Sequence, residues 1–171
     1  VETKVTPQER NRVAIDFYIN EGSTARIKEV KIIGVTKFDE DDLLSRLDLK
    51  PTSFMSWWNK DDRYSRQVLT GDLEKIRSFY MDRGYLDFDI ENTTVSISET
   101  KKNVYIAIII DEGDKYNFGN IKISGKYYPL NEEEIFQNDI KTIKGEVFSR
   151  KLLNQSTESI NQELGNYGYA F

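Results

Sequence analysis

Apolar residues alternate along two stretches of the chain that end in the same dipeptide. NRVAIDFYINEG ends at Gly22 and NVYIAIIIDEG ends at Gly113, a separation of 113 minus 22, or 91 residues. Such alternation is typical of strands with one buried face. Four apolar positions keep the same phase at this offset: Val13, Ile15, Phe17 and Ile19 precede Val104, Ile106, Ile108 and Ile110. The chain therefore contains an internal repeat.

Each Glu-Gly pair is followed by a pattern that predicts a strand and then a helix. RIKEVKIIG ends at Gly34, and GNIKISG, residues 119–125, ends at Gly125, again 91 residues later. An acidic helix start follows in both copies. The N-cap pairs of capping-box type are Asp39 with Asp42 and Asn131 with Glu134.

A second helix is predicted in both copies. In the first copy Ser65 is the expected N-cap and Gly84 ends the helix. Its apolar stripe consists of Leu69, Leu73, Ile76 and Tyr80. In the second copy Ser149 and Gly168 take the same places. The corresponding stripe consists of Leu153, Ile160 and Leu164.

A predicted hairpin at 87–98 and 103–112 completes the first copy, so the repeating unit has the order strand, helix, helix, strand, strand. This order predicts an α+β fold of tandem units. Each unit is expected to be a three-stranded mixed sheet with two helices on one face. We expect residues 1–22 to be the C-terminal hairpin of a preceding unit and residues 23–114 to be a complete unit. Residues 115–171 are expected to form a truncated unit with the first strand and two helices.

The strand at 103–112 is the most continuously apolar, so we place it at the centre of the sheet between 25–34 and 87–98. In the last of these strands, Ile90 and Val95 lie five residues apart, whereas strict alternation requires an even separation. The sequence therefore predicts a bulge near residues 91–94 of an exposed edge strand.

The composition narrows the chemistry that the chain can perform. Among 171 residues, 24 Lys and Arg face 29 Asp and Glu, a net charge of −5, which argues against a nucleic-acid partner. The absence of Cys and His excludes disulfides, the usual zinc sites and Ser-His-Asp catalysis. We expect no enzyme activity, no cofactor and no metal. The acids of FDEDDLL, which could be imagined as a cation site, better fit the first turn of a helix.

Several motifs in sequence order resemble a known family. VTPQERNRV, DLLSRL, WWN, GDLEKIRSFYMDRGY and NYGYA are similar to the periplasmic POTRA array of BamA-type outer-membrane protein assembly factors. The resemblance covers essentially the whole chain. It corresponds to the end of the second domain, the third domain and the first part of the fourth domain of such an array.

The resemblance implies a periplasmic scaffold that binds a β-propeller assembly lipoprotein, other assembly lipoproteins and unfolded outer-membrane proteins. In this family a C-terminal barrel, absent from this sequence, provides the membrane attachment. The edge strand of the third domain is associated with strand addition. Carried over by position, the partner-binding residues are Phe88, Ile90, Glu91, Asn92, Thr93, Thr94, Val95 and Ile97.

Two alternatives stay open. Val95 and Ile97 could simply pack beneath the helices and leave the edge without a partner. The chain could also be a POTRA module of another system, such as a two-partner secretion transporter or a cell-division protein.

Two pairs of aromatic residues and the two terminal segments carry further structural expectations. Trp57 and Trp58 between the helices form either a secondary contact or a local packing cluster. Tyr85 and Tyr169, each following a Gly, are expected to insert between helix and sheet. Because the two terminal segments are complementary halves of one unit, we also expect swapped or head-to-tail self-association of the chain.

Overall fold

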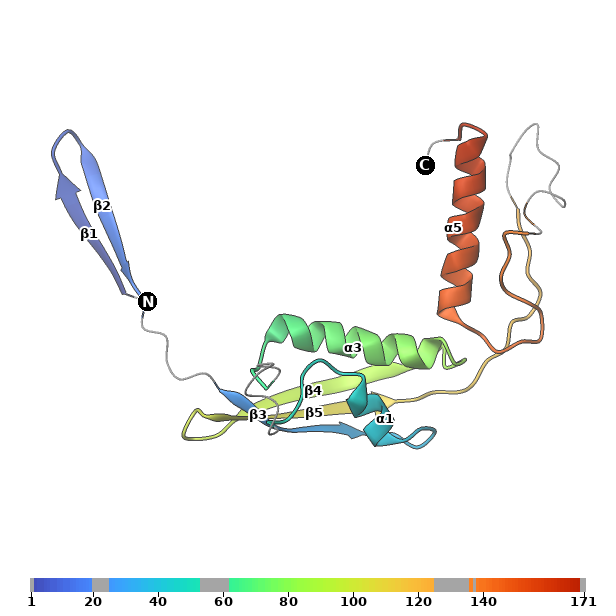
Figure 1. Ribbon diagram of the computed structural model, residues 1–171, viewed down its shortest axis with the longest axis horizontal. Coiled ribbons are helices and arrows are strands. Elements are labelled where there is room, and N and C mark those ends of the chain that lie inside the picture. Colours follow the sequence, from blue (N-terminus) through green and yellow to red (C-terminus); the bar gives the residue numbers. More distant parts are fainter. Residues whose placement is uncertain (1, 20–24, 53–61, 125–135, 137, 170–171) are drawn as a thin grey trace.

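The computed structural model describes residues 2–19, 25–52, 62–124, 136 and 138–169. Its elements follow one another from an N-terminal hairpin through a three-stranded unit to a long C-terminal helix (Figure 1). In chain order they are β1 (Glu2–Gln8), β2 (Arg12–Tyr18), β3 (Arg26–Ile33), α1 (Glu40–Ser45), α3 (Arg66–Met81), β4 (Asp89–Ile97), β5 (Asn103–Asp111) and α5 (Arg150–Asn166).

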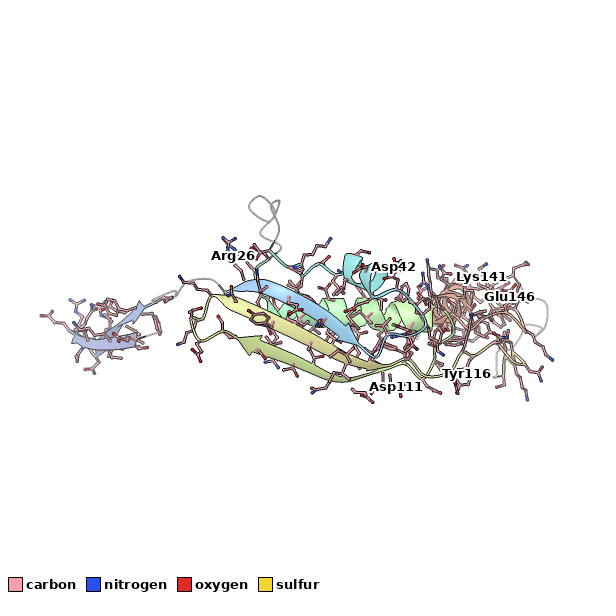
Figure 2. The ribbon with its side chains drawn as sticks, turned by 90° about the horizontal axis from the view of Figure 1, so that it is seen from below. Arg26, Asp42, Asp111, Tyr116, Lys141 and Glu146 are labelled. Atoms are coloured by element: carbon pink, nitrogen blue, oxygen red, sulfur yellow. The ribbon has the colours of Figure 1, made fainter. Side chains whose placement is uncertain are left out.

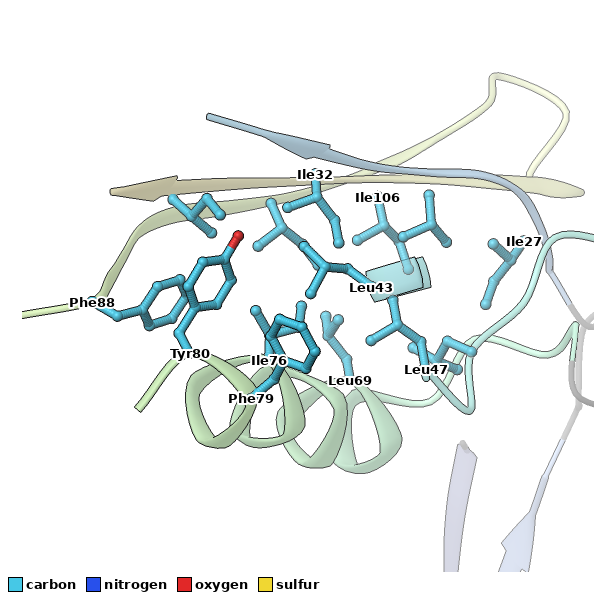
Figure 3. Close-up of a cluster of buried hydrophobic side chains, with 14 of the residues drawn as sticks. Ile27, Ile32, Leu43, Leu47, Leu69, Ile76, Phe79, Tyr80, Phe88 and Ile106 are labelled. Atoms are coloured by element: carbon cyan, nitrogen blue, oxygen red, sulfur yellow. The ribbon is translucent and has the colours of Figure 1, made fainter. Parts of the chain in front are cut away.

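The middle unit confirms the predicted order of strand, helix, helix, strand, strand. Its sheet has the order β3-β5-β4, with β3 parallel and β4 antiparallel to the central strand β5. Both α1 and α3 lie on the same face of this sheet, where Leu43 of α1 and Ile76 of α3 join one core (Figure 3). The fold is therefore α+β with a mixed sheet, as the hydrophobic pattern predicts.

The core of this unit lies between β5 and α3 (Figure 3). The four predicted inward positions of β5, Val104, Ile106, Ile108 and Ile110, are at most 4% exposed. From α3 they meet Leu69, Ile76 and Tyr80, with Leu73 partly buried beside them. Tyr85 is also buried in this core, as predicted, and its ring lies edge-on to that of Tyr80 with centroids 5.7 Å apart. Burial of each such side chain stabilises the fold by about 1.5–3 kcal/mol.

The predicted N-caps of all three helices are present. Asp39 accepts a hydrogen bond from the backbone N–H of Asp41, and Ser65 and Ser149 accept from Val68 and Leu152. The expected capping box at Asp42 was wrong. Its carboxylate instead pairs with the guanidinium of Arg46 one turn later, at 3.0 Å, which is the ordinary alternative for an acid on an exposed helix face.

Gly34 ends β3 for a steric reason. Its φ is +102°, and a Cβ at this position would lie 2.2 Å from the carbonyl oxygen of Ile110. Only glycine can adopt this conformation so close to the neighbouring strand. The glycine at the end of β3 is thus required by the sheet itself.

The strand predicted at 119–125 was wrong. Residues 114–124 contain no strand, and Asn117 makes only an isolated antiparallel bridge to Val147. In the middle unit the matching strand β3 pairs with β5. Among the described strands, none pairs with residues 119–124, so their backbone groups join no ladder. The helix expected to begin at Asn131 lies outside the described residues.

The apolar stripe expected on α5 is only partly buried. Leu153 is 45% exposed, while Ile160 and Leu164 are half-buried. Tyr169, expected to insert between helix and sheet, is half-buried as well. The helix therefore keeps its apolar stripe partly in contact with solvent.

Candidate docking edge

A three-stranded open sheet has two edges, and here they are β3 and β4. An edge strand directs half of its backbone N–H and C=O groups away from the sheet, where they can pair with an added strand. The two edges of this sheet differ in how much of that backbone other residues already occupy.

The β3 edge is closed at both ends by residues of its own unit. The backbone N–H of Ile32 donates to Oε1 of Glu40 at 2.9 Å. At the other end, the N–H of Ile27 donates to the carbonyl of Asp62 at 2.7 Å, and the carbonyl of Ile27 accepts from the N–H of Thr52 at 2.9 Å. An added strand would have to displace these partners, so β3 is a poor docking edge.

The pairing of β4 with β5 fixes which backbone groups of β4 point outward. The N–H of Ser98 donates to the carbonyl of Asn103 at 2.9 Å. Hydrogen-bonded and non-hydrogen-bonded pairs alternate along an antiparallel ladder, so residues 92, 94 and 96 also bond to β5. The outward-facing groups therefore belong to Thr93, Val95 and Ile97.

Within the described parts of the chain, no hydrogen bond outside the sheet ladder reaches these three residues. The first half of the strand is less open. Its register shifts between Ile90 and Asn92, which confirms the predicted bulge and places it at Glu91. Arg77 of α3 also reaches over this end, 3.4 Å from both the carbonyl of Phe88 and the carboxylate of Asp89. The open edge is thus the half after the bulge.

The inward side chains of β4 change from core to surface along the strand. Phe88 is 2% exposed and stacks on Tyr80, with ring centroids 4.3 Å apart. Ile90 and Val95 are partly buried against the core, and Thr93 is half-buried. Ile97, in contrast, is 58% exposed. The alternative in which both Val95 and Ile97 pack beneath the helices therefore holds for Val95 alone.

The opposite side chains of β4 are polar and mostly uncharged after the bulge. Asn92, Thr94 and Ser96 are exposed, as is Glu91 at the bulge. A strand added here would meet backbone groups, short neutral side chains and the apolar surface of Ile97. Such an edge can accept many sequences because the main chain supplies most of the interaction.

The end of β5 beside the bulge is held by a buried carboxylate. Glu112 accepts hydrogen bonds from the backbone N–H groups of Thr36 and Lys37, from the Thr36 hydroxyl, and from the hydroxyl of Tyr80 at 2.8 Å. Burial alone would raise the pKa of Glu112, but these donors outweigh it and lower that pKa. Burial, followed by the bond to Glu112, raises the pKa of Tyr80. The Glu-Gly motif thus has a structural role at the end of β5.

Sequence reasoning missed the residues that distinguish the two edges. Glu40 was visible only as one acid among several at a helix start, and its contact with Ile32 depends on how α1 docks. The second predicted contact, Trp57 and Trp58, lies outside the described residues. Where the structure describes the chain, no three acidic, His or Cys residues are grouped to hold a metal, and no helix is long and apolar enough to cross a membrane.

Comparisons with known proteins agree with this architecture. The POTRA family model, described as a surface antigen variable number repeat, matches residues 25–113 and 116–171. The outer membrane protein assembly factor BamA of Buchnera aphidicola is 33% identical over 161 residues, which cover 93% of this chain and 25% of that protein. BamA of Neisseria meningitidis is 28% identical over 172 residues, covering 100% of this chain and 21% of that protein. The chain spans about a quarter of the length of these relatives.

A solved structure supports the fold. The crystal structure of BamA POTRA3-5 from Haemophilus influenzae has a TM-score of 0.62 to this chain at 17% sequence identity. The match covers 94% of this chain and 59% of that one.

Proposed function

The chain belongs to the POTRA family, and from this premise we propose that it is a periplasmic scaffold module of the outer-membrane β-barrel assembly machinery. The similarity to two BamA proteins along nearly the whole chain supports this choice over other systems that use POTRA units. The module acts by binding rather than by chemistry.

The proposed division of the chain follows its repeat. Residues 1–22 are the closing hairpin of one unit, 23–114 a complete unit, and 115–171 the beginning of the next. The two stretches that match the family, 25–113 and 116–171, support the second and third parts of this division. The hairpin β1–β2, with the register Val5 to Ile15, supports the first part.

In this scaffold the β4 edge is the docking site. The observation that carries the proposal is the difference between the two edges: Glu40 and residues 52 and 62 occupy β3, while the outward groups of Thr93, Val95 and Ile97 bond to nothing else in the described chain. The occupants are an extended segment of an unfolded outer-membrane protein and the β-propeller assembly lipoprotein. Other assembly lipoproteins bind the same array.

A backbone NMR titration with a peptide from an outer-membrane barrel strand tests this proposal, followed by a titration with the β-propeller lipoprotein. We expect chemical-shift changes concentrated in residues 91–98. Val95→Pro removes the central outward N–H and leaves the β5 ladder intact, because Pro is tolerated on the open side of an edge strand. It should raise the Kd for the peptide about tenfold, which corresponds to a loss of roughly 1.4 kcal/mol in binding free energy.

Val95→Thr is the matched control, since it keeps the outward N–H and the β-branched shape. It should bind the peptide as the unaltered chain does. If Val95→Pro folds and binds equally well, or if the shifts fall elsewhere, β4 is not the docking edge and the Trp57 and Trp58 segment becomes the next candidate.

The alternative is a POTRA module of a two-partner secretion transporter or a cell-division protein. Co-purification from the source cell separates the two. Recovery of assembly lipoproteins with this chain supports the barrel-assembly function, whereas recovery of a secretion or division partner alone supports the alternative.

A further inference from the structure

Contacts between the middle unit and the following segment gather at the C-terminal end of α3. Figure 1 shows that α5 rises from this end of the unit. Figure 2 places Tyr116 just beyond Asp111, where the chain leaves the sheet. Contacts of Asp82, Tyr116 and Gly84 meet within this small region.

The first contact is a helix cap that one unit supplies to the next. Asp82 is the C-cap residue of α3. Its Oδ1 accepts a hydrogen bond from the backbone N–H of Lys151 at 2.7 Å and lies 3.5 Å from the hydroxyl of Ser149. Ser149 is the N-cap of α5, so Lys151 lies in the first turn, where backbone N–H groups have no partner within the helix. The carboxylate therefore completes the cap of a helix that belongs to the following unit.

The second contact centres on Tyr116. Its hydroxyl donates to Oδ2 of Asp87 at 2.6 Å, and its backbone N–H donates to the carbonyl of Gly84 at 2.8 Å. The bond to Asp87 raises the pKa of Tyr116. The carbonyl of Tyr116 in turn accepts from the N–H of Phe148, next to the start of α5. Tyr116 thus links the loop after α3 to the residue that precedes the N-cap of α5.

The third contact is a close steric fit at Gly84. A Cβ at this position would lie 2.9 Å from the side chains of both Lys115 and Val147 and 3.0 Å from the carbonyl oxygen of Tyr116. Its φ of +102° also favours glycine. The corresponding Gly168 has a similar φ of +86°, but no atom lies within 4 Å of such a Cβ. The conformation recurs in both copies, whereas of these two glycines only Gly84 has close neighbours in the described chain.

We propose that this joint, formed by Asp82, Asp87, Gly84 and Tyr116, fixes the angle between the middle unit and the α5 segment. The bond that Asp82 accepts from Lys151 and the bonds that Tyr116 donates to Asp87 and Gly84 together oppose rotation about the short connection at residues 112–115. A single flexible linker would allow that rotation. Asp82 and Asp87 are positioning residues: they set the direction in which the array continues. This inference concerns the joint and does not depend on which partner occupies β4.

Pulsed electron paramagnetic resonance between two spin labels tests the joint directly. The chain has no cysteine, so Gln67→Cys on α3 and Asn161→Cys on α5, both at exposed helical positions, provide unique labelling sites. We expect one narrow distance distribution for the otherwise unaltered chain. Asp82→Ala combined with Tyr116→Phe should at least double its width.

Two controls separate the joint from general destabilisation. Asp82→Asn keeps a capping oxygen, since Asn and Asp are similar N-cap acceptors, and it should retain the narrow distribution. Asp16→Asn removes a carboxylate from the distant hairpin and should also change nothing. Hydrogen exchange of β5 should be the same in all variants, because the core of the middle unit is untouched.

Two results would overturn the proposal: a broad distribution in the unaltered chain, or an unchanged narrow one in the folded double variant. If the double variant does not fold, Tyr116→Phe alone provides the test, because this 40% exposed side chain loses only its hydroxyl. Broadening in that variant supports the joint, and an unchanged distribution rejects the role of the Tyr116 hydroxyl bond to Asp87.

Discussion

Oε1 of Glu40 accepts a hydrogen bond from the backbone N–H of Ile32 at 2.9 Å. This contact joins the first residue of α1 to the free side of β3, so the helix start covers an edge that would otherwise be open. Covering an edge with polar side chains is one way in which proteins prevent unwanted strand pairing. Among the described residues, the half of β4 after the bulge has no such cover on its outward groups.

Glu40→Ala is expected to open the β3 edge. Loss of a hydrogen bond to a charged acceptor should lower the free energy of unfolding by about 1.5–3 kcal/mol. In a titration with the barrel-strand peptide, new chemical-shift changes should appear along residues 28–33. Asp41→Ala is the control, because Asp41 is an exposed acid of the same helical turn whose backbone N–H bonds to Asp39 and whose carboxylate makes no hydrogen bond to β3 in the described chain. Shifts confined to β4 in Glu40→Ala would contradict the protective role.

Deletion of Glu91 is expected to lengthen the open edge. Glu91 is the extra residue of the bulge, since Ile90 pairs with Ile110 and Asn92 with Ile109. Without it, Phe88, Ile90, Thr93 and Val95 alternate regularly and all keep their inward orientation, so the unit should remain folded. A regular edge pairs more readily with another strand. Sedimentation should therefore detect stronger self-association.

Replacement of Glu91 by Gln is the matched control for this deletion. It removes the charge and keeps the bulge, so it should leave the sedimentation behaviour unchanged. Equal self-association of the deletion variant and the unaltered chain would show that the bulge does not protect the edge.

The pattern of apolar residues predicted the middle unit because each of its elements has a complete set of partners within the sequence. The odd spacing of Ile90 and Val95 located the bulge, and continuous apolarity located β5 at the centre. The same reasoning failed at 119–124. The residues there have the composition of a strand, but pairing partners decide whether a strand forms.

Contacts between elements could not be predicted in the same way. Asp82 and Asp87 are ordinary polar residues in the sequence, and their roles depend on where Lys151 and Tyr116 lie after folding. Glu40 is a similar case, because a helix-start acid usually interacts with its own helix. The glycine of the RGY motif, Gly84, predicted the end of α3. Its close fit against the next segment is visible only in the folded structure.

The hairpin β1–β2 predicts self-association of the 171-residue chain. Its apolar face, formed by Val5, Val13, Ile15 and Phe17, is 51–65% exposed. The residues of β5 that correspond to β2 by the repeat are buried under α1 and α3. We expect residues 115–171 of a second copy to cover this face, so that the sedimentation coefficient rises with concentration.

Ile15→Asp should abolish this concentration dependence by placing a charge on the apolar face. Thr6→Asp is the control, since Thr6 pairs with Ala14 on the opposite face of the hairpin. Equal association of both variants would assign the contact to a different surface.

Glu112→Gln is expected to destabilise the middle unit most strongly near neutral pH. The carboxylate accepts from two backbone N–H groups and two hydroxyls, and an amide would direct N–H donors at some of these donors. A buried unsatisfied donor costs about 1–3 kcal/mol.

Because the folded pKa of Glu112 is lowered, its contribution to stability is fully present above the unfolded-state pKa and is lost as pH falls through the folded-state pKa. Urea unfolding of both proteins from pH 7 down into this acidic range should therefore show their stabilities converging. A constant difference at all pH values would mean that the ionised carboxylate is not what secures the end of β5.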